Sequence, residues 1–166
     1  MRRTLVAVIT TVSAAAMISG ASLAAASASP ASPASSGIEH VRIVSTSATS
    51  NESSAIATGV FTAGGVDITG PTTDTFKFPG GTFKVKHRAV QTKQTFNGKT
   101  CLFTVSERGT YTINGGTGAY ARIRGSGKYV ADTLGVAARN SKGKCSITLT
   151  PAAVQEVVTT QGPVKL

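Results

Sequence analysis

The 166-residue chain has little charge and few aromatic rings. Asp, Glu, Lys and Arg make up 14% of its residues, Phe, Trp and Tyr make up 5%, and Trp is absent. Coiled coils and helical bundles are excluded, because both need abundant Glu, Lys and Leu and neither tolerates 18 glycines. Disorder is not expected either, because a 40% hydrophobic content with so little charge supports a core. We expect one compact domain built of short strands and turns.

The N-terminus has the pattern of a secretory signal peptide over residues 1–28. Arg2 and Arg3 form a positively charged start, an apolar stretch follows from Leu5 to Ile18, and Ala26-Ser27-Ala28 is a small-residue cleavage site. The apolar stretch is shorter than the roughly 20 residues of a membrane-spanning helix. We therefore expect cleavage after Ala28, with the bond two residues earlier as an alternative. The product is a secreted, extracellular protein with no membrane span.

A Pro/Ala/Ser linker over residues 29–37 separates the signal from a single domain, which we assign to residues 38–166. The linker begins SPASPASS and has nothing to bury. Removal of the signal leaves 15 basic residues against 7 acidic ones, a net charge of +8 with His neutral. The mature protein is therefore strongly basic.

Cys101 and Cys145 are the only cysteines of the chain. In an exported protein they are expected to form one intramolecular disulfide, which joins neighbouring strands or a strand and an adjoining loop. A metal-binding or nucleophilic thiol is the alternative. It is disfavoured because there is no Cys-x-x-Cys spacing and because a free thiol would oxidise outside the cell.

Short runs of β-branched and aromatic residues, separated by Gly- and Pro-containing turns, predict eight strands. Two stretches, 38–58 and 82–97, lack Gly and Pro and could each hold some helix. The short connections favour an antiparallel meander. The fold class is therefore all-β, an eight-stranded antiparallel up-and-down (calycin-like) barrel with one disulfide, and a β-sandwich is the alternative. The predicted strands are His40–Ser45, Ile56–Thr62, Thr82–Lys86, Leu102–Ser106, Gly109–Ile113, Gly127–Ala131, Ser146–Thr150 and Ala153–Thr159.

Alternation within the strands indicates which side faces the core. Phe83 and Val85 fall on one face of their strand, and Lys84 and Lys86 fall on the other. All nine aromatic residues lie between Phe61 and Tyr129. The middle of the chain therefore supplies the centre of the core or the lining of any cavity.

The segment 111–129, which reads YTINGGTGAYARIRGSGKY, is the most distinctive part of the chain. It is not a dinucleotide-binding fingerprint, because the third glycine is replaced by Ala121 and a strand rather than a helix is expected to follow. It is not a phosphate loop, because no Gly-Lys-Ser/Thr follows at the required spacing. Its glycines are typical of tight connections and of strands that bend at the corners of a small barrel.

This segment resembles the dirigent and allene oxide cyclase superfamily. The resemblance rests on Gly115, Gly116, Thr117, Gly118, Tyr120, Gly125 and Gly127. More narrowly, the chain is similar to small exported actinobacterial proteins of the allene oxide cyclase barrel-like kind, through Gly59-Val60-Phe61-Thr62, Phe78-Pro79-Gly80-Gly81-Thr82 and Gly162-Pro163. The resemblance implies an eight-stranded antiparallel barrel with an apolar lumen, often oligomeric. Its better-known relatives steer cyclisation or radical coupling of bound hydrophobic molecules.

One local cluster is a candidate ligand site. It comprises Glu107, Tyr111, Tyr120, Arg122 and Tyr129. On an extended strand Tyr120, Arg122 and Arg124 share one face, so an aromatic ring could lie beside two guanidinium groups and orient an anionic or phenolic ligand. The simpler interpretation of these residues is a basic stripe that faces solvent. No catalytic residue is assigned, because the acidic residues are scattered and no triad or paired-carboxylate spacing is present.

We expect no cofactor and no metal, since His40 and His87 are far apart in sequence and have no companion ligands. Basic residues concentrate at Lys84-x-Lys86-x-Arg88 and at Arg139–Lys144. A nucleic-acid partner is not expected, because neither stretch interleaves aromatic residues or forms a basic helix. Anionic polymers of a cell surface, bound without sequence specificity, fit the charge better.

Three hypotheses of function follow. The first is binding or sheltering of a small hydrophobic molecule without catalysis. The second is an allene oxide cyclase-like or dirigent-like protein, cyclase- or isomerase-like in activity, that templates cyclisation or coupling by confining its substrate. The third is a structural, surface-associated protein with a filled barrel. A cavity would separate the first two from the third, and a homo-oligomer is compatible with all of them.

Overall fold

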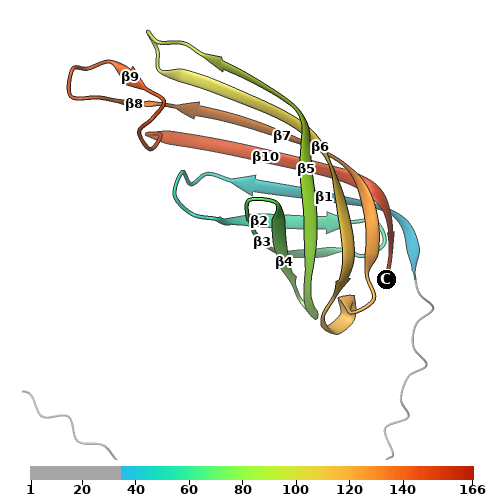
Figure 1. Cartoon of the computed structure of the whole chain (residues 1–166). Helices are drawn as coiled ribbons and strands as arrows, with labels where there is room; N and C mark the ends of the chain where they lie inside the picture. The colour runs from blue at the N-terminus through green and yellow to red at the C-terminus, as the bar shows by residue number, and fades with distance from the viewer. Residues whose placement is uncertain (1–34) are drawn as a thin grey trace, which may run out of the picture. The chain divides into compact units, whose positions relative to one another are not determined.

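The computed structural model describes residues 35–166 (Figure 1). The expected signal peptide and most of the expected linker lie outside these residues. The first strand begins at Ser36, two residues before the expected start of the domain at residue 38. The elements are β1 (Ser36–Ser45), β2 (Glu52–Thr58), β3 (Ala63–Ile68), β4 (Thr73–Phe78), β5 (Gly81–Phe96), β6 (Leu102–Gly116), the 3-10 turn η1 (Gly118–Tyr120), β7 (Arg124–Val136), β8 (Ala138–Arg139), β9 (Cys145–Ser146) and β10 (Ala153–Lys165).

Eight of these strands form a closed antiparallel barrel in the order β1-β10-β7-β6-β5-β4-β3-β2. Consecutive strands are neighbours throughout, except that the small β8-β9 sheet is inserted between β7 and β10. The barrel closes where β1 pairs with β10, from Ser36 opposite Lys165 to Ser45 opposite Glu156. The expected all-β, eight-stranded antiparallel barrel is therefore confirmed, and the alternative β-sandwich is wrong.

Several strand boundaries differ from the expectation. Runs 102–106 and 109–113 belong to one strand, β6, because Gly109 stays in the ladder opposite Tyr129. In the run 146–150 only Ser146 is in a strand. Strands β3 and β4 were not expected, because β3 opens with Ala-Gly-Gly and β4 carries Asp and Lys, a composition typical of turns.

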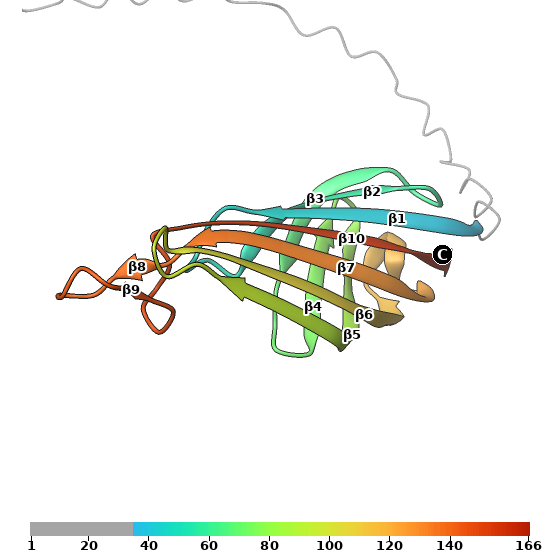
Figure 2. The ribbon, with the colours of Figure 1, turned by 90° about the horizontal axis from the view of Figure 1, so that it is seen from above.

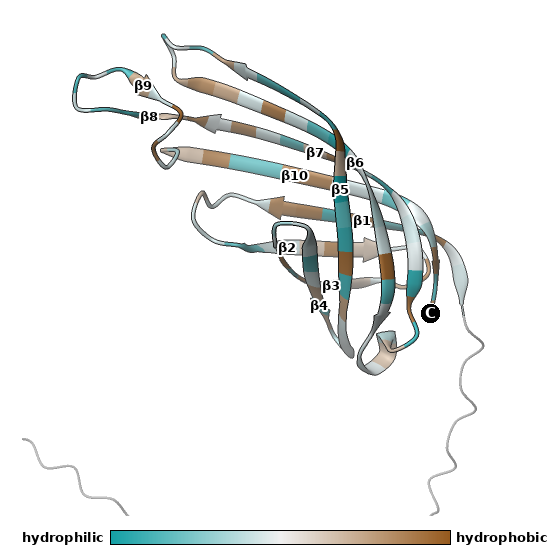
Figure 3. Cartoon of the chain, in the orientation of Figure 1, coloured by the Kyte–Doolittle hydropathy of each residue, from teal (hydrophilic) through white to brown (hydrophobic). Residues whose placement is uncertain are grey.

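The two stretches that could have held helix are strands. Residues 38–58 form most of β1, a turn and β2, and residues 82–97 lie almost wholly in β5. In β5, Phe83 and Val85 are buried while Lys84 and Lys86 are exposed, as the alternation predicts. Figure 3 shows this alternation as bands of opposite hydropathy along β5. Burial of one face outweighs any local helical preference of these residues.

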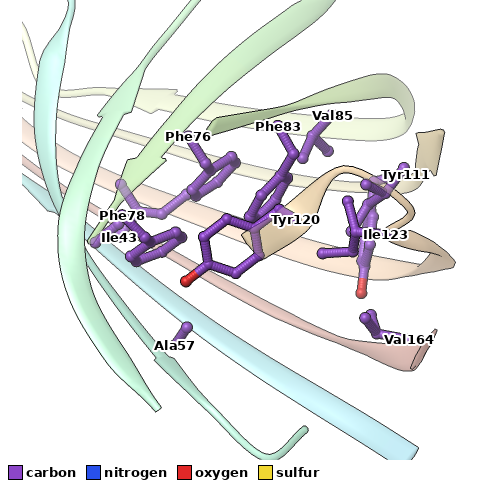
Figure 4. Close-up of a cluster of buried hydrophobic side chains, with 12 residues drawn as sticks. Ile43, Ala57, Phe76, Phe78, Phe83, Val85, Tyr111, Tyr120, Ile123 and Val164 are labelled. Carbon is purple, nitrogen blue, oxygen red and sulfur yellow. The ribbon is translucent and has the colours of Figure 1, made fainter. Parts of the chain in front are cut away.

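One end of the barrel is filled by aromatic side chains (Figure 4). The rings of Phe76 and Phe83 are stacked with centroids 5.3 Å apart, and Phe78 lies 5.9 Å from both. Tyr120 enters this cluster from η1, 5.4 Å from Phe83, and Phe61 lies 5.1 Å from Tyr120. The expected aromatic core is therefore present at this end. The packed rings fill this end of the barrel.

The η1 turn reaches the core because glycine permits a close approach. Gly118 has φ +57°, and a Cβ at this position would overlap the carbonyl oxygen of Gly80. The neighbouring Ala119 N–H donates to that same oxygen over 2.9 Å. A side chain at position 118 would be strained in conformation and would push η1 away from the β4-β5 turn. The glycine-rich segment thus holds Tyr120 in place.

Cross-strand pairs of an aromatic residue and a glycine recur along β6 and β7. Gly109 lies opposite Tyr129, and Tyr111 lies opposite Gly127. A Cβ on either glycine would overlap the ring of its partner. Each glycine therefore provides the space in which its partner's ring lies across the ladder, which directs both tyrosines along the inside of the barrel.

The long strands β5, β6, β7 and β10 continue past the end of β1, and β8 and β9 lie beyond the end of β7 (Figure 2). Here Cys101 and Cys145 form the expected disulfide, with Cα atoms 5.1 Å apart. It joins the loop before β6 to β9. The disulfide therefore fixes the small sheet to the end of the barrel where β6 begins and β7 ends.

Candidate functional site

The barrel encloses a cavity of about 200 Å³ whose wall includes residues from all eight barrel strands. A cavity of about 150 Å³ is large enough to bind benzene, so this one can take a small ring-containing molecule. Its apolar wall is formed by Val41, Ile43, Phe61, Phe76, Phe83, Val85, Ile113, Ala131, Val158 and Val164. Such walls favour a ligand with an apolar body.

The polar part of the wall is acidic. Five of the seven acidic residues of the chain line the cavity, and among the described residues no Lys or Arg does. Each of the five comes from a different strand, and His87 on β5 is the one histidine beside them. The acidic residues are Glu39 (β1), Asp67 (β3), Asp74 (β4), Glu107 (β6) and Glu156 (β10).

Asp67 is the most perturbed of these carboxyl groups. Only 2% of the residue is exposed. Its Oδ2 accepts a hydrogen bond from the Thr69 hydroxyl at 3.2 Å, and its Oδ1 is buried without a partner. Burial, and next the negative charge of Asp74, raise the pKa of Asp67 to about 7. The group can therefore exchange a proton near neutral pH.

Glu39 is a second buried carboxyl group with one unpaired oxygen. The backbone N–H of Phe61 donates to its Oε2 over 3.1 Å, while Oε1 has no partner. Burial raises the pKa of Glu39 as well, against the hydrogen bonds it accepts. A buried acceptor left unpaired costs free energy, which a ligand that donates to it can recover.

Asp74 and Glu107 have partners. Asp74 Oδ1 accepts a hydrogen bond from the Gly70 N–H at 2.9 Å and lies 3.3 Å from Nε2 of His87. Glu107 Oε1 accepts from the Tyr129 hydroxyl at 2.7 Å. Burial, and then this bond to Glu107, raise the pKa of Tyr129, so the phenol stays protonated and keeps donating.

The candidate residues from the sequence fall into three places. Glu107, Tyr111 and Tyr129 line the cavity. Tyr120 lies in the aromatic core, where its hydroxyl donates to the Pro79 carbonyl over 3.4 Å. Arg122 is exposed between η1 and β7.

The expectation that Tyr120 shares a face with Arg122 and Arg124 is wrong. Residues 118–120 form a 3-10 turn, which breaks the two-residue alternation assumed for an extended strand. Tyr120 points into the core as a result, and the two arginines are exposed. No aromatic and guanidinium site forms there.

Sequence reasoning missed Glu39, Asp67, Asp74, Glu156 and His87. Two of them carried a readable signal. Glu39 alternates with Val41 and Ile43 on β1, and Glu156 alternates with Val158 on β10, so each acid shares a face with apolar residues. An acid in phase with a buried face indicates a lined cavity rather than a surface.

The basic residues lie on the outside. Lys84, Lys86 and Arg88 alternate outward along β5 and are exposed, whereas the cavity wall carries the acids. The opposite charges of this protein are thus separated by the thickness of one sheet. The interior attracts cations and the exterior attracts anions.

No family model, curated protein or solved structure matches the chain. The resemblance to the allene oxide cyclase and dirigent superfamily stays a prediction. Within residues 35–166 there is no group of three or more His, Cys, Asp or Glu arranged to hold a metal ion. Over the same residues, no helix is long and apolar enough to cross a membrane.

Proposed function

We propose that this protein binds a small, largely apolar molecule inside its barrel, outside the cell, after removal of its leader. The observation that carries the proposal is the cavity of about 200 Å³ with its aromatic and aliphatic walls. A barrel that serves only as a structural body is less consistent with such a space, because protein interiors are normally filled to crystal-like density. The volume corresponds to a molecule built around one ring.

Native mass spectrometry of the exported protein, followed by extraction of bound molecules, tests this proposal. A matched pair of variants on β7 makes the test specific. Ala131 lines the cavity and the adjacent Val130 does not, so Ala131→Phe fills the cavity while Val130→Phe adds the same ring on the outside. Retention of a small molecule by the wild type and by Val130→Phe, and its loss from Ala131→Phe, supports binding in the barrel. Equal retention by both variants places the molecule elsewhere.

A second candidate is cyclase-like or dirigent-like catalysis on the bound molecule. It is favoured by Asp67, whose pKa of about 7 suits a group that both gives and takes protons at neutral pH. Incubation of the extracted molecule with wild type and with Asp67→Asn tests it. Catalysis predicts a new product with the wild type alone, while both proteins still bind the molecule. Recovery of the molecule unchanged from both leaves binding as the whole function.

The exposed basic residues support one further part of the proposal, contact with anionic polymers of a cell surface. Lys84, Lys86 and Arg88 place three positive charges in a row on the outside of β5. Such contact is weakened by salt, because exposed charges are screened over about 10 Å at about 0.1 M. Co-sedimentation with cell-wall material at low and high salt measures it, and Lys84→Gln with Lys86→Gln should reduce it. Sedimentation that does not depend on salt or on these lysines contradicts it.

A further inference from the structure

Two carboxyl groups of the cavity wall each have one buried oxygen without a hydrogen-bond partner. These oxygens are Oδ1 of Asp67 and Oε1 of Glu39, and each residue is only 2% exposed. The other oxygen of each group is held by the protein, through the Thr69 hydroxyl and the Phe61 N–H. The remaining oxygen of each group is therefore buried at the cavity wall without a donor, and a ligand that reaches it would supply the missing hydrogen bond. Burial makes a charged donor the strongest partner for such an acceptor.

The charge of the cavity wall determines whether a cationic or an anionic ligand is favoured. Five carboxyl groups line the cavity, no Lys or Arg among the described residues does, and the one histidine beside them, His87, lies next to Asp74. An anionic ligand would meet repulsion from most of these groups in a region of low dielectric. A cation would be attracted by them, and it would also remove the mutual repulsion of Asp67 and Asp74.

The residues around Asp67 favour a ligand with an aromatic ring. Asp67 lies directly opposite Phe76 across the β3-β4 ladder, and Phe76 stacks on Phe83 at 5.3 Å. Both rings line the cavity. A flat ring fits against this aromatic wall, and an attached cation also gains from nearby ring faces. The volume of about 200 Å³ limits the ligand to about one ring and a short chain.

We propose that the ligand of this cavity is a small protonated arylalkyl amine, whose ammonium group donates to Oδ1 of Asp67 while its ring lies against Phe76 and Phe83. This inference rests on the proposed binding function and adds the class of ligand to it. A bare metal ion is a poorer occupant, since the described residues hold no metal-binding group of three or more ligands. A neutral alcohol offers a weaker donor to a buried carboxylate than an ammonium does.

Binding of the amine should depend on the ionisation of Asp67. The charged and titratable groups that act on Asp67 are Asp74 from β4, His87 from β5 and Glu156 from β10. With the pKa of Asp67 at about 7, the ionised fraction rises about tenfold from about pH 6 to about pH 8. Amine affinity should rise by a similar factor over this range. The affinity of a neutral ligand should not rise, because it gains nothing from the added negative charge.

The experiment is isothermal titration calorimetry with three probes of nearly equal size: phenethylamine, phenethyl alcohol and phenylacetate. Wild type should bind phenethylamine about 10-fold to 100-fold more tightly than phenethyl alcohol, the advantage of a hydrogen bond to a charged group. Phenylacetate should bind most weakly. Asp67→Asn should remove most of the preference for the amine over the alcohol, while the outward-facing, exposed Asp132→Asn should leave both affinities unchanged.

The outcomes separate this inference from the proposed function. Binding of phenethyl alcohol as tightly as phenethylamine by the wild type overturns the amine assignment and leaves apolar binding in place. If none of the three probes binds, the amine assignment is overturned, and the retention of a bound molecule in native mass spectrometry decides the proposed function. An amine preference as large in Asp67→Asn as in the wild type overturns the placement of the ammonium group at Asp67. The wild-type comparison and its pH series need no variant, so they decide the ligand class even if Asp67→Asn does not fold.

Discussion

Asp67 should make the folded protein less stable as the pH rises. Its pKa is raised from its ordinary value of 3.8 to about 7 in the folded protein, whereas the unfolded chain restores the ordinary value. Between these two values the folded state binds more protons than the unfolded state. The free energy of unfolding must therefore fall with increasing pH over this range, which is the reverse of the effect of a salt-bridged carboxylate. Asp67→Asn removes the ionisation and should remove this fall.

The magnitude follows from the size of the pKa shift. Each unit corresponds to about 1.4 kcal/mol, so a shift of about three units sets an upper limit of about 4 kcal/mol, spread between about pH 4 and about pH 8. At about pH 8 Asp67→Asn should accordingly be more stable than the wild type, and at about pH 4 the two should be nearly equal. Glu39 contributes a dependence of the same sign, which the variant keeps.

Urea unfolding followed by tyrosine fluorescence at a series of pH values measures this effect. Asp132→Asn, which neutralises an exposed acid on the outside of β7, is the control and should keep the wild-type slope. The raised pKa of Asp67 is refuted if the free energies of unfolding of the wild type and of Asp67→Asn change in parallel from about pH 4 to about pH 8. In that case Asp67 would ionise in the folded protein as it does in the unfolded chain.

Three other changes test the architecture, each by the free energy of unfolding in urea. Replacing both Cys101 and Cys145 by Ser should cost about 4 kcal/mol, because the disulfide closes a loop with a sequence separation of 44; no loss would mean that the small sheet and the barrel unfold independently. Gly109→Ala should cost about 1–3 kcal/mol, because the new methyl group would overlap the ring across the β6-β7 ladder; a stabilised variant would contradict that crowding. Phe83→Ala should cost about 3–5 kcal/mol from the aromatic core, whereas Lys84→Ala on the opposite face should change stability by less than about 0.5 kcal/mol. Similar losses for the two would mean that β5 is not buried on one side.

Most of the fold could be predicted from local sequence patterns. The glycine turns and β-branched runs predicted an all-β protein and six of its eight barrel strands, because a strand buried on one face needs that alternation wherever it lies. The predicted total was also eight, because one strand was divided into two runs and one predicted run lies outside the barrel. The patterns failed where local composition was ambiguous. Strands β3 and β4 contain glycines, Asp67 and Asp74, and residues of this kind are more often found in turns. They are strands here because closure of the barrel supplies hydrogen-bonding partners on both sides.

The candidate site was predictable only in part. Glu107, Tyr111 and Tyr129 are close enough in sequence to be considered together, and all three line the cavity. Asp67 and Glu156 could not be linked to them from the sequence. They are far apart in the chain, and the interaction of their charges depends on both side chains facing the interior of one closed sheet.

Residue types and local patterns were sufficient to predict the strand-forming segments, the single disulfide pairing, the aromatic core and the excess of positive charge. Each of these depends on residue type, on alternation along one strand or on a pairing that has no alternative. Local patterns could not show that five of the seven acidic residues line one cavity, because that depends on the complete fold. These residues lie on five different strands, and what brings them together is the register between strands and the closure of β1 onto β10. Register and closure are set by packing over the whole barrel, so no short stretch of the chain encodes them.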